Sequence, residues 1–352
     1  MKWPLLSLLT AVTIFGNCAQ PAAKNKVQQP VSSEDNPDLF HPNNQVLSSH
    51  IEFLYWSAVE GALMYAQKMT QPAWSSGATN AVQGKYENST YNIDPGLRVS
   101  MSFFRAPRFW EIWASYTRLT SRGESSAKAP SRPGEYLTSA WPVPAAIGSL
   151  THANSSLHLN YNVTDFYVDR YFNPNPHLRV RMIAGLTGTW IEQNWAMKYF
   201  GSTGFTQSVR NHWTYWGCGM RFGLMGDWFW TNDIYLTARG TLGGFIGPYH
   251  NRAIQRTNSL DPTSNNALPI RDGDYRDTRP VGNLQLIVGP SWQKNWDAMR
   301  TELFVGYEMN TWTNLQEVYH STLGDPSDFK ETWINTGYIA LQGLTARFTI
   351  DY

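Results

Sequence analysis

The feature that most limits the fold of this chain is a two-residue alternation of apolar and polar side chains. In residues 97–103, Leu97, Val99, Met101 and Phe103 alternate with Arg98, Ser100 and Ser102. Successive side chains of a β-strand point to opposite faces, so a period of two predicts a strand. Beyond the first 19 residues the chain has no run of about 18 apolar residues, which a membrane-spanning helix requires. The sequence therefore predicts an all-β protein.

The alternation recurs in about ten segments, an even number as in bacterial single-chain barrels, although 12 strands are an alternative. The segments are 51–63, 97–103, 110–117, 157–163, 178–186, 216–224, 234–239, 283–288, 302–310 and 338–352. Short links at 105–108, 173–176, 226–228 and 295–297 alternate with longer polar segments at 67–91, 121–153, 201–208, 251–278 and 314–334. This pattern predicts a closed antiparallel transmembrane β-barrel with short periplasmic turns and long extracellular loops.

Composition favours a membrane barrel over its alternative, a soluble β-sandwich or lipocalin-like barrel. Aromatic residues make up 14% of the chain and charged residues 16%, where about 25% charged is ordinary. We therefore expect the apolar face of each strand, including Leu157, Leu159, Tyr161 and Val163, to meet lipid. Tryptophans near the expected strand ends fit a membrane interface. They are Trp110, Trp213, Trp228, Trp230, Trp292, Trp296, Trp312 and Trp333.

The polar faces of the same strands carry many charged side chains, which we expect to line the lumen and to pair there. The predicted lumen charges are Glu52, Glu60, Arg98, Glu111, Arg179, Arg181, Arg221, Arg239, Arg300, Glu302, Glu308 and Arg347. Asp165 and Asp169 are expected to be partners for arginines and not metal ligands. Because arginine dominates this set, a pore would have a weak anion preference. Because ten strands enclose a narrow lumen, its conductance should be small or its lumen partly plugged.

The two ends of the chain indicate export. Residues 1–19 combine Lys2 with an apolar run and predict a cleaved signal peptide, and 20–46 predict a disordered or extended leader. The barrel is then expected over 47–352. Phe348, Ile350 and Tyr352 form an alternating terminal strand that ends on an aromatic residue. They resemble the signal read by the barrel-assembly machinery of outer membranes, so we expect that machinery and outer-membrane lipids as partners.

Several classes of function are disfavoured. A net charge of +1 gives no electrostatic reason to expect nucleic acid. No phosphate-binding loop, Cys/His cluster or carboxylate-rich metal motif is present, so no cofactor is expected. His152, His212, His250 and His320 lie near expected loop ends outside any recognisable motif, so a barrel hydrolase is the weaker alternative and we predict no enzyme. Cys18 and Cys218 allow no disulfide framework.

Three segments resemble one known family. They are 53–56 with Glu60, Gly61, Tyr65 and Ala66; 162–166; and 216–224. They look like the Legionella-type major outer-membrane proteins, a pore-forming family also found in environmental chlamydiae, and the similarity extends over most of 47–352. The cysteine-rich pattern of classical chlamydial porins is absent. The resemblance implies passive diffusion of small solutes and a structural role in the envelope. A surface adhesin or purely structural barrel is the alternative, and homo-oligomerisation is left open.

Overall fold

The computed structural model describes residues 45–69, 84–105, 109–141, 149–258, 267–296, 299–321, 331–334 and 337–352, with the strands at 318–321 and 331–334 described by their backbone alone. The expected signal peptide and most of the expected leader lie outside these residues. The first strand begins at Gln45, two residues before the barrel was expected to start.

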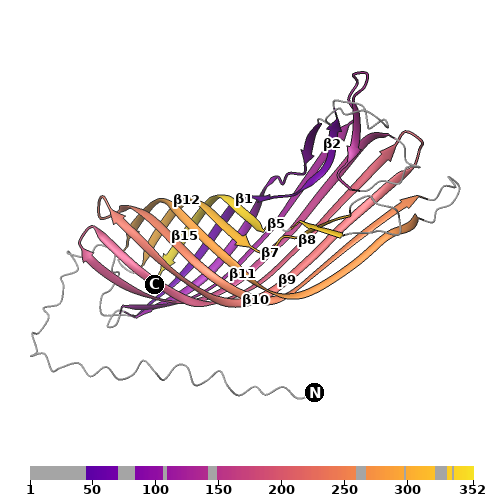
Figure 1. The fold of residues 1–352 in the computed structure, drawn as a ribbon. Helices are drawn as coiled ribbons and strands as arrows, with labels where there is room; N and C mark the ends of the chain where they lie inside the picture. The colour runs from indigo at the N-terminus through magenta and orange to yellow at the C-terminus, as the bar shows by residue number, and fades with distance from the viewer. Residues whose placement is uncertain are drawn as a thin grey trace, which may run out of the picture.

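Ten antiparallel strands form a closed ring, which confirms the predicted fold class (Figure 1). In order around the ring they are β1 (Gln45–Glu60), β4 (Ile93–Arg105), β5 (Trp110–Lys128), β7 (Leu150–Asn175), β8 (Leu178–Gly201), β9 (Thr206–Phe229), β10 (Ile234–Asn258), β11 (Ala267–Asn295), β12 (Arg300–Thr313) and β15 (Tyr338–Asp351). The first and last of these strands pair from Ser48 opposite Asp351 to Glu60 opposite Ile339, and this pairing closes the barrel.

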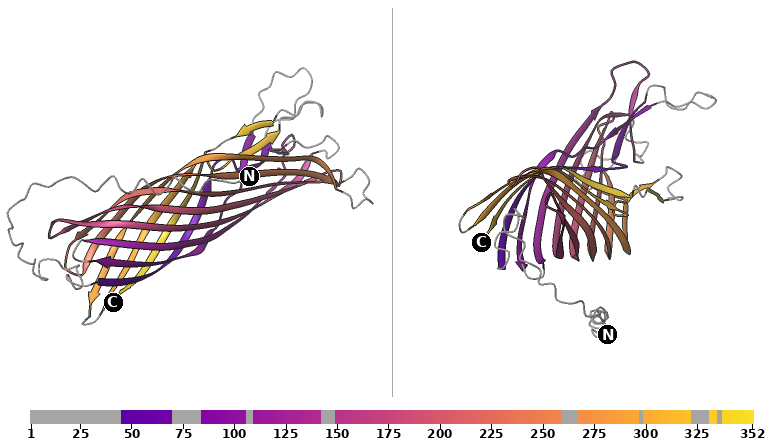
Figure 2. Two further views of the ribbon diagram at one scale, coloured as in Figure 1. Left: turned by 90° about the horizontal axis from the view of Figure 1, so that it is seen from below. Right: turned by 90° about the vertical axis from the view of Figure 1, so that its left-hand side faces the viewer.

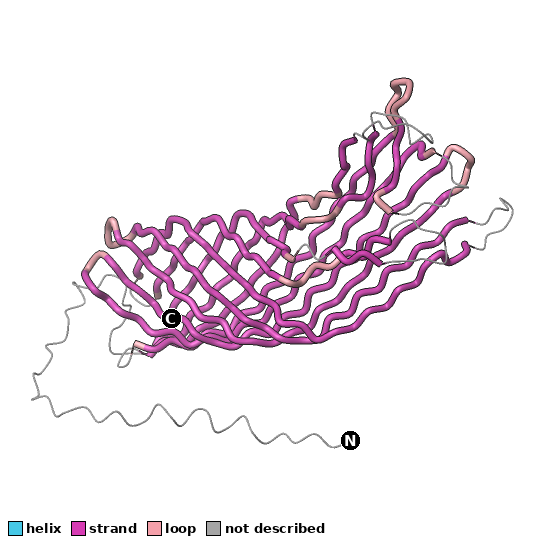
Figure 3. The backbone as a smooth tube through the Cα atoms, viewed as in Figure 1, coloured by secondary structure: helices cyan, strands magenta, loops and turns pink. Residues whose placement is uncertain are grey.

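Short accessory strands extend the wall at the end of the barrel opposite the C-terminus (Figure 1). β2 (Met64–Met69) pairs with β3 (Gly84–Asn88) and with β6 (Tyr136–Ser139), which joins the ring through β7. β13 (Val318–Ser321) and β14 (Glu331–Ile334) form a separate hairpin. Most of the described backbone is strand, with turns at the two ends and further loop residues at 61–63, 89–92 and 314–317 (Figure 3).

The strands are of two lengths, and this gives the barrel an uneven height. β7 to β11 have 24 to 29 residues, whereas β1, β4, β12 and β15 have 13 to 16. A transmembrane β-strand needs only about 9–11 residues. The long strands therefore continue well past the ends of the short ones, as the side views show (Figure 2).

This extra length corrects several expected loops and turns. The segments 121–153 and 251–278, expected to be loops, are strand in part: β5 and β7 extend into 121–128 and 150–153, and β10 and β11 extend into 251–258 and 267–278. The expected loop at 201–208 is a tight turn between Gly201 and Thr206, and the turn expected at 226–228 lies at 230–233 because β9 runs on to Phe229. In 121–153 and 251–278, polar outward residues of a strand were taken for a loop, whereas at 226–228 the inward Asp227 was taken for a turn residue.

The polarity of the barrel wall reverses along its length. In the half nearer the C-terminus, called here the proximal section, outward side chains are apolar, as at Met182, Leu186 and Phe222, which are 55–58% exposed. In the other half, called the distal section, outward positions are polar, as at Asn160, Lys198 and Arg252. The inward positions change in the opposite sense, from charged to apolar.

β7 shows the reversal most clearly because its pairing with β5 stays in register throughout. Odd-numbered residues point inward along this stretch, from Asp169 and Asp165 in the proximal section to Leu159 and Leu157 in the distal section. Leu157, Leu159, Tyr161 and Val163 are therefore buried, and the expectation that they meet lipid is wrong. In this part of the strand the apolar face packs into the barrel, as in a soluble protein.

Aromatic side chains mark both edges of the apolar outer face. Trp110, Trp228, Trp230, Trp292 and Trp296 are 43–60% exposed near the proximal end, as predicted. Trp190 and Trp216 face each other across β8 and β9 at the other edge, 56% and 62% exposed. From Trp216 to Trp228 on one strand, a tilt of about 40° gives a height of about 30 Å, which matches the thickness of a membrane's apolar core.

Trp213 and Trp312 do not belong to these interfacial layers. Both are fully buried in the distal interior, so the prediction that they lie at a membrane interface is wrong. Their indole rings pack in the apolar core of the distal section. The side chain of Trp333 is not among those that the structure describes.

Candidate functional site in the barrel interior

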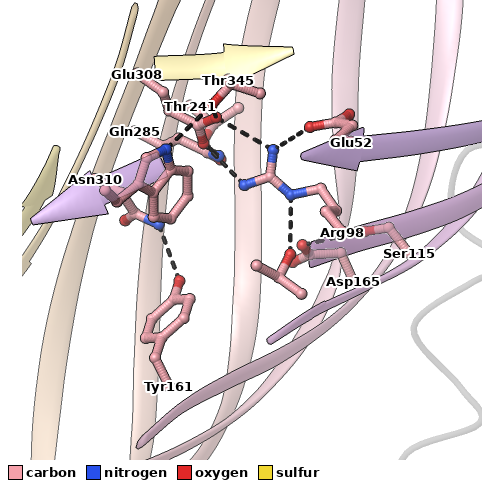
Figure 4. A network of polar contacts seen from close by, with 12 residues as sticks. Glu52, Arg98, Ser115, Tyr161, Asp165, Thr241, Gln285, Glu308, Asn310 and Thr345 are labelled. Atoms are coloured by element: carbon pink, nitrogen blue, oxygen red, sulfur yellow. Dashed lines mark hydrogen bonds and ion pairs between the residues drawn. The ribbon is translucent and has the colours of Figure 1, made fainter. Parts of the chain in front are cut away.

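The centre of the proximal lumen is occupied by a network around Arg98, which points inward from β4 (Figure 4). Its guanidinium makes ion pairs with Glu52 at 2.6 Å and with Glu308 at 2.9 Å, and its Nε donates to Thr117 at 2.9 Å. These three partners come from β1, β12 and β5. One side chain thus ties together the walls on several sides of the lumen.

Glu308 is saturated with hydrogen bonds. Besides Arg98, it accepts from Thr345 at 2.9 Å and from Gln285 at 2.5 Å, and its side chain is 0% exposed. A buried charge is stable only when it is paired and its remaining lone pairs are satisfied. This carboxylate meets both conditions, so the network is a rigid part of the interior.

A second group of ion pairs closes the lumen nearer the turns. Asp227 binds Arg179 at 2.6 Å and Arg181 at 3.3 Å, and the latter also lies 3.7 Å from Glu111. Asp227 is completely buried and also accepts from Thr237 at 2.7 Å.

Further pairs complete the ring of charges. Arg347 binds Glu302 at 2.8 Å and Arg300 binds Asp351 at 2.5 Å. Arg221 binds Asp165 at 3.1 Å and donates to the Tyr167 hydroxyl at 2.7 Å. Several of these pairs join side chains directly opposite on neighbouring strands, as in Glu52 with Arg98 and Arg300 with Asp351. The pairs of Arg98 with Glu308 and of Arg221 with Asp165 join strands that are not neighbours, so the charges fill the interior instead of lining an open channel.

The structure brings most of the predicted lumen charges together inside the proximal section. Buried there are Glu52, Arg98, Glu111, Arg179, Arg181, Arg221, Glu302, Glu308 and Arg347, with Arg239 and Arg300 partly buried. Glu60 lies apart from them at the end of β1, where Gln193 and Gln316 donate to its carboxylate at 2.5 and 2.9 Å.

Two acids in the proximal interior were missed from the sequence, and they change the charge balance there. Asp227 and Asp351 both face inward on their strands and neutralise arginines of the predicted set. Asp165, expected to pair with an arginine, does so. Because the carboxylates balance the arginines, the basis for an anion preference is weaker than the sequence suggested. The missed signal was the alternation itself, since Asp227 and Asp351 share a face with Arg221 and Arg347.

Two small voids lie between these side chains. One cavity of ≈ 30 Å³ is lined by Arg98, Asp165 and Arg239, and another of ≈ 20 Å³ by His50, Glu111 and Arg300. A buried water needs at least about 10–15 Å³ measured in this way. Each cavity therefore holds one or two waters and no larger solute.

Apolar packing closes the distal interior. Trp56, Trp195, Trp213, Tyr199 and Tyr249 are all 0–1% exposed and belong to one continuous core. The backbone after β12 also turns inward, so that Leu315 and Gln316 are fully buried, and Glu317 binds Arg279 at 2.7 Å. Inward glycines such as Gly217 leave the space that the neighbouring Tyr215 ring fills.

Three of the four histidines singled out in the sequence lie on the outer face of the wall. His212 and His250 bind carboxylates on the outer face, Glu192 at 2.9 Å and Asp274 at 2.5 Å, while the side chain of His320 is not described. His152 stacks on Phe200, also on the outer face. Within the described ranges, no group of three His, Cys, Asp or Glu side chains could hold a metal ion.

One buried contact has the right residue types for nucleophilic chemistry but lacks access. His50 Nε2 lies 3.3 Å from the Ser102 hydroxyl, and that hydroxyl donates to Glu111 at 2.5 Å. His50 and Ser102 are 6% and 2% exposed, and the adjoining void is the ≈ 20 Å³ cavity. A substrate cannot reach them, and the base that a hydrolase needs must lie within reach of its substrate.

An apolar band of membrane thickness, two aromatic layers and a closed ten-stranded ring define a transmembrane β-barrel of the outer-membrane type. Over the described residues, no helix is long and apolar enough to cross a bilayer. The chain belongs to the family of the Legionella pneumophila major outer membrane protein precursor, which matches residues 42–348 and so confirms the resemblance seen in the sequence. It is therefore a protein of the outer membrane.

Other comparisons add little to this assignment. No curated protein matches the sequence. Among solved structures, the Escherichia coli outer membrane protease OmpT is similar at 10% identity and a TM-score of 0.38, over 90% of this chain and 99% of that one. The Pseudomonas putida toluene transporter TodX is similar at 11% identity and a TM-score of 0.34, over 88% of this chain and 90% of that one. At these values neither likeness carries an argument about function.

Proposed function

We propose that this protein is a structural barrel of the outer membrane whose resting lumen is closed to ions and solutes. The observation that carries the proposal is the network of Arg98 with Glu52 and Glu308, which bridges the lumen at the level of the bilayer. Above it lies a packed aromatic core and below it the Asp227 ion pairs. A hydrated ion would have to break several buried pairs in succession.

The energetics favour the closed state. Removing one partner from a buried ion pair leaves an uncompensated charge and costs about 3–5 kcal/mol. Opening a path would separate Arg98 from two carboxylates at once. A major envelope protein of this kind contributes a rigid, lipid-embedded wall, and no catalytic activity is part of the proposal.

A narrow diffusion pore is the second candidate, and one observation favours it. The two small cavities are neighbours, since Trp113, Met225 and Arg347 line both, and together they mark a polar path through part of the proximal section. Arg239 lines the larger cavity and makes no ion pair with another described residue. A pore built on this path would be small and would depend on rearrangement of the Arg98 network.

Planar-bilayer recording separates the two candidates. Refolded wild-type protein should give no discrete current steps in 1 M KCl, and a variant lacking the C-terminal strand serves as the unfolded control. Steps that scale with salt in the wild type, and vanish in the control, would overturn the closed barrel and support the pore. The reversal potential in a salt gradient would then test the predicted weak anion preference.

The proposed partners follow from the location. Outward apolar residues of the proximal section would contact lipid, and Phe348, Ile350 and Tyr352 would be read by the assembly machinery. Phe348 and Tyr352 face outward at 45% and 54% exposure, which leaves them accessible on the last strand. Substituting Phe348 with Ser should lower insertion in a reconstituted assembly assay, whereas Tyr55→Ser, at an outward aromatic residue of the neighbouring strand, should not.

A further inference from the structure

The outer face of the distal section differs from one side of the barrel to the other. On β10 and β11, two outward arginines have acidic partners: Arg252 binds Asp272 at 2.8 Å, and Arg276 binds Asp274 at 3.3 Å. On β5, Arg118 and Arg122 are both exposed and face outward, and neither makes an ion pair with another described residue. Both guanidinium groups on β5 are therefore available to a ligand.

These cations lie at the height of the lipid headgroups. Tyr116, two residues before Arg118 on the same face, is 41% exposed, and its hydroxyl donates to Asn162 at 2.9 Å. Tyrosines occupy this position at membrane interfaces, and cations just beyond them meet anionic headgroups. Arg122 lies four residues, or about 13 Å, beyond Arg118 along β5, directly opposite His158 on β7.

A groove adjoins the cations on the side away from the membrane. It measures ≈ 630 Å³ and crosses β5, β7 and β8. Its outward lining includes Ser126, Asn154 and Ser156, with Glu124 and Lys198 also present. Hydroxyl and amide groups of this kind hydrogen-bond sugar hydroxyls, and the volume is in the range of small-ligand sites, about 300–1,000 Å³.

We propose that Arg118, Arg122 and His158, called here the β5–β7 patch, together with this groove bind the headgroup of a phosphorylated glycolipid in the outer leaflet. The two arginines would hold phosphate, for which the guanidinium fork is well suited, and the groove would take adjoining sugars. Asp94 Oδ2 accepts from the Arg122 backbone amide and the Ser121 hydroxyl at 2.7 and 3.0 Å, and no ion pair joins this carboxylate to either arginine side chain. Glu124 lines the groove at the end nearer Arg122, and Lys198 lies opposite Asn154 at the other end.

The test measures binding of rough lipopolysaccharide to the full-length protein in detergent. The same lipid, dephosphorylated, is measured in parallel. Relative to wild type, the double variant Arg118→Ala/Arg122→Ala should raise the Kd at least tenfold for the intact lipid and leave the dephosphorylated lipid unchanged. The matched control is Arg252→Ala, which removes an exposed but paired arginine. All three proteins should keep the heat-modifiable gel mobility of a folded barrel, since the substituted residues are exposed.

The salt dependence and one further variant sharpen the result. Higher salt should weaken wild-type binding more steeply than binding by the double variant, because fewer phosphate contacts remain. Ser156→Phe, which fills the groove, should weaken binding of the intact lipid severalfold. Equal Kd values for wild type and double variant, or an equal loss in Arg252→Ala, would overturn the proposal. Competition by the same concentration of inorganic phosphate would show a free-anion site instead and would also overturn it.

Discussion

The proximal and distal sections of this barrel use the same strands in opposite ways. In the proximal section, apolar side chains such as Leu186 face out and the Arg98 network fills the interior. In the distal section, polar side chains such as Lys198 face out and Trp195 fills the interior. The backbone does not change, so the solvent on each side decides which residues the wall needs. The comparison shows that a membrane barrel can continue into water as a soluble barrel without a break in its strands.

The largest expected effects come from the two interiors, and they should differ in kind. Glu308→Ala leaves Arg98 with one carboxylate in a buried site, and we expect it to lower the free energy of unfolding by about 3–5 kcal/mol. Glu308→Gln keeps the shape and one of the two acceptor oxygens and should cost less. Guanidinium unfolding in liposomes, followed by tryptophan fluorescence, measures both. A cost below about 1 kcal/mol for the alanine variant would show that the network adds little to stability.

Removing a distal core residue should cost a similar amount for a different reason. Trp195 is 0% exposed and donates to Ser155 at 2.8 Å, so Trp195→Ala leaves a cavity and should cost about 3–5 kcal/mol. Trp216→Ala, which removes an outward indole at the membrane edge, should cost much less. The same unfolding assay compares the two. Equal losses would contradict the inward packing of the distal core.

The outer faces give the next largest contrast. Leu186→Arg places a charge in the apolar band and should cost about 2–4 kcal/mol, whereas Ser156→Arg, outward in the distal section, should stay within about 0.5 kcal/mol. Folding yield and unfolding free energy in liposomes measure the difference. If both substitutions are tolerated equally, the boundary between the sections is misplaced.

The smallest effect concerns an exposed distal ion pair. The hydrogen bond from Arg252 lowers the pKa of Asp272, so the contribution of the pair is present above the usual aspartate pKa and is lost as the pH falls through the lowered value. Because the pair is fully exposed, solvent screens it strongly. Asp272→Asn should therefore leave the unfolding midpoint unchanged at pH 7 and at pH 3. A clear shift at pH 7 would indicate that this pair is structurally coupled to the wall.

Much of the proximal section could be predicted from the sequence because the two-residue alternation indicates both where a strand lies and which of its side chains face the lumen. At 97–103 the alternation gives the strand, and Arg98 on its polar face gives the lumen. The ten-stranded ring follows from counting such segments. Asp227 was missed because it lay in a segment assigned to a turn.

The distal section was harder to predict, since alternation alone does not say which face is inside. At 157–163 the apolar residues are odd-numbered, whereas the next outward apolar residues, Phe166 and Val168, are even-numbered. The apolar residues move from odd to even positions, yet β7 has no bulge there in its pairing with β5. Odd-numbered side chains therefore point inward throughout, and what changes is the environment outside the wall. That shift at Val163 to Phe166 was visible in the sequence and marks the membrane boundary. Glu52 lies directly opposite Arg98 on the neighbouring strand, whereas the pairing of Arg98 with Glu308 depends on strand register around the ring and not on local pattern.

The reversal of the wall is tested most directly by water access along one strand in an intact bilayer. In a background with Cys18→Ser and Cys218→Ser, single cysteines are placed at Leu186 and at Lys198, both outward on β8, and treated with a membrane-impermeant maleimide in proteoliposomes. We predict rapid labelling at Lys198→Cys and none at Leu186→Cys until the bilayer is dissolved and the protein unfolded. Labelling of Leu186→Cys as fast as Lys198→Cys in the intact bilayer would contradict the account.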